Sequence, residues 1–187
     1  NDDYFEELWL EEGLAHIAED LNGYAASNIG RANLFLADPG SVTLIHGGDA
    51  LEERGASLLF LRLISERVGN DIFKSLVQTR TIGTANVEAA TGSYFKELFA
   101  DWTAALYLSG RGITDDPRFN YTSIDLLADF EALAVASGIV SPAGMGGYVK
   151  SMAPEYILYS VPRSGSLDFS IGSDASGRFN AVVVRLQ

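Results

Sequence analysis

Three titratable side chains, Glu12, His16 and Glu19, recur at helical spacing in the stretch WLEEGLAHIAEDL. At about 100° per residue they project from one side of a helix together with apolar neighbours, and further apolar residues line the opposite side. A helix that is apolar on two sides packs between other elements, which turns Glu12 toward the interior or a cleft. A carboxylate there needs a cation, a metal ion or several hydrogen-bond donors. The simpler alternative is an i, i+4 contact with His16 on a half-exposed helix, which contributes only about a few tenths of a kcal/mol.

The composition of the chain limits the chemistry and the partners. Its 187 residues suit one large domain, or a domain with a small appendage. The formal net charge of −12 and the lack of a basic run argue against nucleic acid and against an anionic membrane surface as partners. The longest apolar run is broken by Arg62 and is too short to span a bilayer. The chain has no cysteine, so a metal site must use His, Asp or Glu.

The opening helix is predicted over about residues 4–21. We expect Asn1, Asp2 or Asp3 as its N-terminal cap and Gly23 as the left-handed residue that ends it. Because the chain starts almost directly inside this helix, it is expected to be a piece of a longer protein.

Further helical segments follow. The sequence predicts a helix near residues 28–36 and a stronger one over residues 50–68, whose middle is apolar nearly all round and so marks a central core helix. Shorter helices are predicted within residues 70–80 and 83–92. The stretch 93–110 carries a wide aromatic stripe, which is typical of a helix packed into the core.

The C-terminal part has a different pattern. Residues 123–138 form one more possible helix, and after Ser141 polar and apolar residues alternate between turn signals, which predicts three or four antiparallel strands. One strand is expected through Leu167, Phe169 and Ile171, and another through residues 181–186. The predicted class is α+β: a mainly helical lobe over residues 1–112, a connecting segment over 113–141 and a small antiparallel β unit over 142–187.

The stretch WLEEGLAHIAED resembles the Trp-Leu-x-Glu-Gly-x-Ala segment of the gluzincin metallopeptidases, a group that includes the aminopeptidase N family and the hyicolysin-like secreted peptidases. In that group an HExxH helix supplies two zinc-ligand histidines and the catalytic glutamate, and a later helix supplies the glutamate that is the third ligand. The resemblance implies that Glu12 is this zinc ligand. It also implies that Glu19 accepts a hydrogen bond from a zinc-ligand histidine, and that His16 lines the core or cleft and does not bind zinc.

Looser resemblances extend this likeness over most of residues 8–108. Residues 52–73 resemble the small-residue helix that these peptidases place behind the active site, and residues 91–106 resemble a later helix with a Trp pattern. The implied fold is the C-terminal lobe of a gluzincin-type catalytic domain.

Two features depart from the family pattern. No HExxH occurs in the chain, so the two histidine ligands and the general base are expected upstream of Asn1. Glu52 occupies the position of an oxyanion-stabilising tyrosine, and a carboxylate cannot take that role unless it is protonated. Arg54, His46 or a tyrosine outside the motif could replace it, or the parent protein could be a weak or inactive peptidase.

Three hypotheses follow from these features. The first is the C-terminal part of a zinc metallopeptidase that hydrolyses peptide bonds, with Glu12 contributing to a zinc site that is incomplete in this chain. The second is a non-catalytic gluzincin-like scaffold used for binding or structure, which the missing HExxH and Glu52 favour. The third is a complete metal site of the chain's own, built from Glu12, His16 and either His46 or Asp49.

The first hypothesis also sets the expected partners and location. The partners are a peptide or protein substrate and the N-terminal part of the same protein, with no nucleic acid and no membrane. The hyicolysin-like resemblance, the acidity and the absence of cysteine favour a secreted bacterial protein, extracellular or periplasmic, and are also compatible with a cytoplasmic one.

Overall fold

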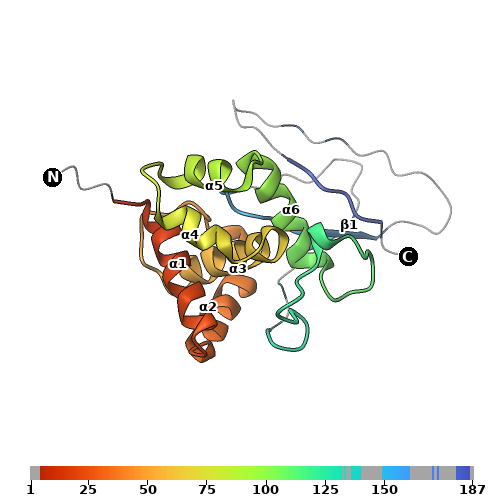
Figure 1. Cartoon of the computed structure of the whole chain (residues 1–187). Coiled ribbons are helices and arrows are strands. Elements are labelled where there is room, and N and C mark those ends of the chain that lie inside the picture. The colour runs from red at the N-terminus through yellow and green to blue at the C-terminus, as the bar shows by residue number, and fades with distance from the viewer. Residues whose placement is uncertain are drawn as a thin grey trace.

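The chain folds into a mainly helical structure, as the sequence predicts; Figure 1 shows its computed structural model. The structure describes residues 5–131, 133, 136–139, 149–160, 170, 172 and 180–185. Within these residues the α-helices are α1 (Leu8–Leu21), α2 (Ala26–Ala37), α3 (Leu51–Val68), α4 (Asp71–Val77), α5 (Gly83–Thr91) and α6 (Phe95–Leu108). The other elements are the 3-10 helices η1 (Pro39–Ser41) and η2 (Pro117–Phe119) and the strands β1 (Ala136–Ile139) and β2 (Ile157–Ser160).

Helix α3 is the centre of the helical lobe. It contacts α1, α2, α4 and α6, and in Figure 1 it lies between α1 and α6. All residues from Gly55 to Leu61 are buried, which confirms the central core helix predicted from the apolar run. Arg62 follows this stretch, and its guanidinium pairs with the Asp20 carboxylate of α1 at 2.6 Å. This ion pair places the one charge of the apolar run at the edge of the α1–α3 interface.

An aromatic cluster joins α1, α2, α3 and α6. Trp9 of α1 meets Phe60 of α3 and Phe95 of α6 edge-on, with ring centroids 6.1 Å and 5.7 Å apart. Trp102 of α6 stacks on Phe35 of α2 with a centroid distance of 5.6 Å. The aromatic stripe predicted for residues 93–110 therefore does pack into the core.

The first helix begins later than predicted, at Leu8 and not near residue 4. Glu6 is held elsewhere: its carboxylate accepts hydrogen bonds from the Gly83 backbone N–H at 2.6 Å and from the Asn86 side chain at 2.8 Å. These contacts tie the preceding segment to the start of α5, so it cannot continue the helix. The three predicted cap residues, 1–3, lie outside the described residues.

The helix predicted over residues 123–138 is wrong. The described part of this segment contains a turn at residues 126–129 and the strand β1. The Asp125 carboxylate accepts hydrogen bonds from the backbone N–H groups of Leu127 and Ala128 at 2.9 Å and 3.1 Å. Side-chain bonds of this kind let aspartate stabilise a turn in competition with a helix.

The strand pair that the structure describes is parallel and includes β1, which lies before the predicted β unit, so the antiparallel pairing predicted within residues 142–187 stays a prediction. β1 and β2 run parallel, with Ala136 opposite Ile157. Residues 140–156 connect them, which is long enough for the crossover that parallel strands require. Residues 180–185 form no strand, although one was predicted there. The strand predicted through Leu167, Phe169 and Ile171 lies outside the described residues.

The segment after α6 folds back onto the helices. The Tyr121 hydroxyl donates a hydrogen bond to the Leu59 carbonyl of α3 at 2.9 Å, and burial raises the pKa of this phenol well above its ordinary value. Glu66 accepts hydrogen bonds from the backbone N–H groups of Thr122 and Ser123. In the described parts of the chain, no helix is both long and apolar enough to cross a membrane.

Candidate functional site

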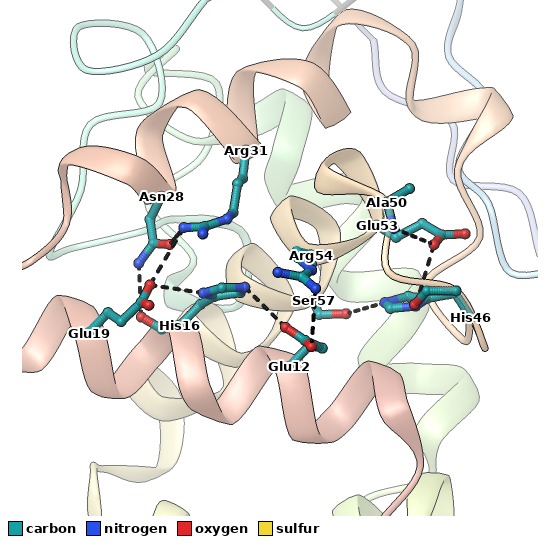
Figure 2. Close-up of polar contacts among 11 residues, drawn as sticks. Glu12, His16, Glu19, Asn28, Arg31, His46, Ala50, Glu53, Arg54 and Ser57 are labelled. Carbon is teal, nitrogen blue, oxygen red and sulfur yellow. Dashed lines mark hydrogen bonds and ion pairs between the residues drawn. The ribbon is translucent and has the colours of Figure 1, made fainter.

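The predicted titratable face of α1 lies where α1 meets α2 and α3. Figure 2 shows Glu12, His16 and Glu19 in a row along α1, with side chains of α2 and α3 directed toward them. His16 is only 3% exposed, and α1 contacts α3 along this side. The structure therefore brings the three predicted residues together at a helix interface.

Gly13 explains why Glu12 lies close to α3. A Cβ atom at residue 13 would lie 2.8 Å from Leu61 Cδ1 and 3.1 Å from Ser57 Cβ, both on α3. Contacts this short are not tolerated without movement. Glycine after the glutamate thus lets the two helices approach, and it holds the Glu12 carboxylate against the first turns of α3.

The two oxygen atoms of Glu12 have different neighbours. Oε1 lies 3.4 Å from Nη2 of Arg54, which belongs to α3. Oε2 lies 3.4 Å from Nε2 of His16 on the next turn of α1. Both separations exceed the ordinary length of a charge-assisted hydrogen bond, about 2.7–2.9 Å. The side chain is 21% exposed, so the carboxylate is fixed between two helices and is still reached by solvent.

His16 is anchored through one ring nitrogen. Its Nδ1 lies 2.9 Å from Oε2 of Glu19, and since a carboxylate only accepts, Nδ1 carries the proton. Its Nε2 is buried and has no hydrogen-bond partner among the described residues. The imidazole is thus oriented from one side, and its other nitrogen faces Glu12.

Glu19 is held by side chains of α2 as well as by His16. Nη1 of Arg31 lies 3.5 Å from its carboxylate, and Arg31 also donates to the Asn28 amide oxygen at 2.7 Å. The hydrogen bond from His16 is the main cause that lowers the pKa of the Glu19 carboxyl. The predicted partner of Glu19 was a zinc-ligand histidine from another segment; within this chain its partner is His16.

The lowered pKa of Glu19 predicts a contribution to acid stability. A carboxyl whose folded pKa lies below its unfolded value, about 4.5, stabilises the fold above that pH, and the contribution disappears as the pH falls through the folded pKa. The free energy of unfolding of the wild type should therefore decline more between about pH 5 and pH 3 than that of a Glu19→Gln variant, since only the wild type can lose this charge. This pH range begins just above the unfolded pKa of the Glu19 carboxyl and extends below it. Urea titrations across this range measure both curves. If the free energies of unfolding of the two proteins fall in parallel with pH, the lowered pKa of the Glu19 carboxyl is contradicted.

His46 forms a separate polar cluster between the loop before α3 and the helix itself. Its Nδ1 lies 2.8 Å from the Gly48 carbonyl and 3.6 Å from the Glu53 carboxylate, and its Nε2 lies 3.2 Å from Oγ of Ser57. An acid, a histidine and a serine in this order could activate a nucleophile. Ser57 is completely buried, so no substrate reaches its hydroxyl, and the cluster fastens the loop to α3.

The residues proposed for a complete metal site are not brought together. Across residues 5–131 and the shorter described ranges, no three His, Asp or Glu side chains are placed to hold one ion. Both nitrogens of His46 already have partners, the Gly48 carbonyl and Oγ of Ser57.

Among the proposed substitutes for the family tyrosine, Arg54 is the one that reaches Glu12. Glu52 lies in the first turn of α3. Sequence reasoning did not identify Arg31 and Asn28 as partners of this face. No local signal could have done so, because they come from α2 and their contacts depend on how α2 packs against α1.

A cavity of about 330 Å³ lies elsewhere, at the end of α6, lined by Ser109, Gly110, Tyr121, Thr122, Ser123, Ile124, Asp125 and Asp129. It is at the lower limit of ligand pockets, which hold about 300–1,000 Å³. The Asp125 and Asp129 carboxylates both accept backbone hydrogen bonds of their own turn. The cavity therefore offers no free pair of reacting groups, and the α1 face is the stronger candidate.

Comparison of the chain with protein-family models, with curated proteins and with solved structures found no match.

Proposed function

We propose that this chain is the C-terminal part of a zinc metallopeptidase catalytic domain and that Glu12 is one of the zinc ligands. The other ligands, two histidines, and the general base would come from an HExxH segment outside this chain. The observation that carries the proposal is the state of the Glu12 carboxylate: it lies at a helix interface, its ion-pair partners among the described residues are Arg54 and His16, each at 3.4 Å, and its side chain remains partly exposed.

The packing of α1 supports a ligand role for this carboxylate. A thermolysin-type zinc site uses two histidines, one glutamate and one open position, and each ligand must be held in place before the ion binds. Gly13 sets the distance between α1 and α3, and Trp9 and Leu10, next to the motif glutamates, are fully buried. These contacts limit the movement of the Glu12 backbone. Zinc bound at such a site supplies a Lewis acid for a peptide carbonyl and an activated water.

Arg54 is the residue that we assign to the role of the missing tyrosine. Its guanidinium lies beside the proposed ligand, and its side chain is 23% exposed. A fixed cation next to the zinc site would stabilise the oxyanion that develops during peptide hydrolysis. Unlike Glu52, arginine carries positive charge at all working pH values.

The test uses the full-length parent protein that contains this chain. The wild type should bind one equivalent of zinc and hydrolyse a peptide substrate. A Glu12→Gln variant keeps the shape of the side chain and removes its charge, so we expect bound zinc and hydrolysis to be lost together. Zinc content is measured by elemental analysis after dialysis, and hydrolysis with a quenched fluorescent peptide library.

Glu11→Gln is the matched control, because Glu11 is the exposed neighbour of Glu12 and the substitution is identical. It should leave zinc content and hydrolysis at the wild-type level. Circular dichroism of both variants separates loss of zinc from loss of the fold. A Glu12→Gln protein that is folded and keeps its zinc would end the proposal.

The Arg54 contact favours a second candidate, the non-catalytic scaffold. An arginine beside Glu12 can neutralise the carboxylate without any metal ion. In that case Glu12 and Arg54 form a structural ion pair, the parent binds no zinc, and Glu12→Gln lowers the thermal stability without changing any metal content. The same measurements on the parent therefore distinguish the two candidates.

A further inference from the structure

The solvent-facing side of α2 is an uncharged strip on a strongly acidic chain. Arg31 is the one charged residue of this helix, and Figure 2 shows its side chain directed toward α1, where it pairs with Glu19. The solvent-facing side exposes Ala26, Gly30 and Leu34, and Leu34 is 49% exposed. Single exposed apolar residues are normal on a protein surface, so the arrangement of these residues along the helix is what matters.

Four exposed residues of this side recur every four positions, which places them in one row along the helix surface: Ala26, Gly30, Leu34 and Asp38, called here the α2 row. Gly30 is a hollow in the row, because a Cβ atom there would meet no atom within 4 Å. Leu34 is a projection one turn further on. A row with a hollow and a projection one turn apart is complementary to an antiparallel copy of itself.

The two ends of α2 are also complementary to each other in charge. A helix attracts negative charge at its N-terminal end and positive charge at its C-terminal end. As the structure describes α2, its first turn has no acidic residue, its N-cap makes no side-chain hydrogen bond, and its last turn has no basic residue. The exposed C-cap residue is Asp38. Its carboxylate therefore lies at the end that disfavours it, and the end that would favour it has none.

We propose that α2 is the interface of a symmetric dimer of this chain, in which two α2 helices pack antiparallel through the α2 row. In this register Leu34 of each copy packs over Gly30 of the other copy. The same register places Asp38 of each copy beside the N-terminal end of the other copy's α2, where a negative charge is favoured. Two copies with a net charge of −12 repel each other overall, and the uncharged strip lets them meet without opposing like charges.

The size of the contact predicts a weak dimer. Helix α2 has 12 residues and so spans about 18 Å. One helix face of this length buries less than the about 1,200 Å² of a stable complex, so we expect a dissociation constant between about 10 μM and about 1 mM. The ion-pair partners of Glu12 are Arg54 and His16, neither of which belongs to the α2 row. The inference therefore goes beyond the proposed peptidase function and does not depend on it.

Sedimentation equilibrium of the 187-residue chain measures the dimer. At about 0.15 M salt, repulsion between charges more than about 8 Å apart is largely screened. The average mass should rise from 20.1 kDa toward twice this value as the concentration is raised to about 1 mM. Leu34→Glu puts a carboxylate into the α2 row of both copies and should weaken the dimer at least about tenfold. A wild type that stays monomeric over this range would overturn the proposal.

Val77→Glu is the matched control for Leu34→Glu, because Val77 is 63% exposed on another helix, α4, and the substitution adds the same charge. It should dimerise as the wild type does. Circular dichroism of both variants confirms that they are folded. A folded Leu34→Glu protein that dimerises as tightly as Val77→Glu would refute α2 as the interface.

Asp38→Asn tests the antiparallel register. It should weaken the dimer about threefold to thirtyfold, because it removes both symmetric contacts between a carboxylate and a helix N-terminal end. Asp115→Asn makes the same charge change at an exposed residue outside α2, and it should leave the dimer at least as tight as that of the wild type, since it only reduces the overall repulsion. If Asp38→Asn tightens the dimer as much as Asp115→Asn does, the register is wrong.

Backbone amide chemical shifts locate the contact on the surface. Between dilute and concentrated samples of the ¹⁵N-labelled wild type, the shifts of residues 26–38 should change. Those of α5 (Gly83–Thr91) should stay constant. Concentration-dependent shifts that lie outside residues 26–38 and leave α2 unaffected would assign the dimer to a different surface and overturn the proposal.

Discussion

Replacing Gly55 by alanine is expected to destabilise the fold by about 3 kcal/mol or more. A Cβ atom at residue 55 of α3 would lie 2.5 Å from the carbonyl carbon of Arg31 and 2.8 Å from the backbone nitrogen of Ala32, both in α2. These atoms belong to a helix backbone and cannot move without moving α2. The gain in helix propensity from glycine to alanine is only about 1 kcal/mol, so the steric cost dominates. Urea denaturation followed by circular dichroism measures the change.

Gly30→Ala is the matched control, because Gly30 also lies inside a helix, α2, and a Cβ there meets no atom within 4 Å. The same substitution should stabilise the fold by about 0.5–1 kcal/mol. Opposite signs for the two variants are the expected result. If Gly55→Ala is as stable as the wild type, the close contact of α2 and α3 is wrong, and with it the position of Arg31 near Glu19.

Trp102→Ala is expected to lower the free energy of unfolding by about 3–5 kcal/mol, the range for removing a large aromatic side chain from a core. Trp102 is completely buried. Its ring stacks on Phe35 with an interplanar angle of 12° and meets Phe60 edge-on at 5.7 Å. Since small domains have a total stability of about 5–15 kcal/mol, this variant should be close to unfolding, which thermal and urea denaturation would detect.

Tyr24→Ala serves as the control for Trp102, since Tyr24 is an aromatic residue that is 72% exposed. Its removal should change the stability by no more than about 0.5 kcal/mol. A loss below about 1 kcal/mol for Trp102→Ala would mean that the aromatic cluster repacks or is not the core. The slope of the urea transition should stay the same if only stability changes.

Two glycines, Gly13 of α1 and Gly55 of α3, determine how the charged side chains around α1 are placed. Gly13 and Gly55 are both sites of close helix contact, and they place the carboxylate of α1 and the arginines of α2 and α3 in one interface. Positive charge from Arg31, Arg54 and Arg62 offsets the acidic residues of α1 along this interface. Each of these guanidinium groups therefore lies beside a carboxylate of α1.

Local sequence patterns predicted those elements whose formation depends on neighbours in the chain. The apolar run of α3 and its end at Gly69 are observed close to the predicted limits. The end of α1 is also as predicted: Gly23 has a φ of 82°, and the Tyr24 N–H closes the helix on the Glu19 carbonyl at 2.9 Å. Helix periodicity also placed Glu12, His16 and Glu19 on one face.

Contacts between segments far apart in the sequence decided features of the fold that local patterns did not predict. The start of α1 depends on hydrogen bonds from Glu6 to α5. The parallel pairing joins β1 (Ala136–Ile139) with β2 (Ile157–Ser160), which are separate in the sequence. Such contacts join segments that are far apart in sequence, so no local period or turn signal encodes them.

The sequence by itself determined which residues of α1 carry the chemistry, because a helix places every third or fourth residue on one face whatever surrounds it. Only the tertiary structure decided which side chains of other helices meet that face: Arg54 of α3 lies beside Oε1 of Glu12, and Arg31 of α2 lies beside the Glu19 carboxylate. The partners come from other helices, and their distances are set by close packing at Gly13 and Gly55, which is a property of the folded chain as a whole.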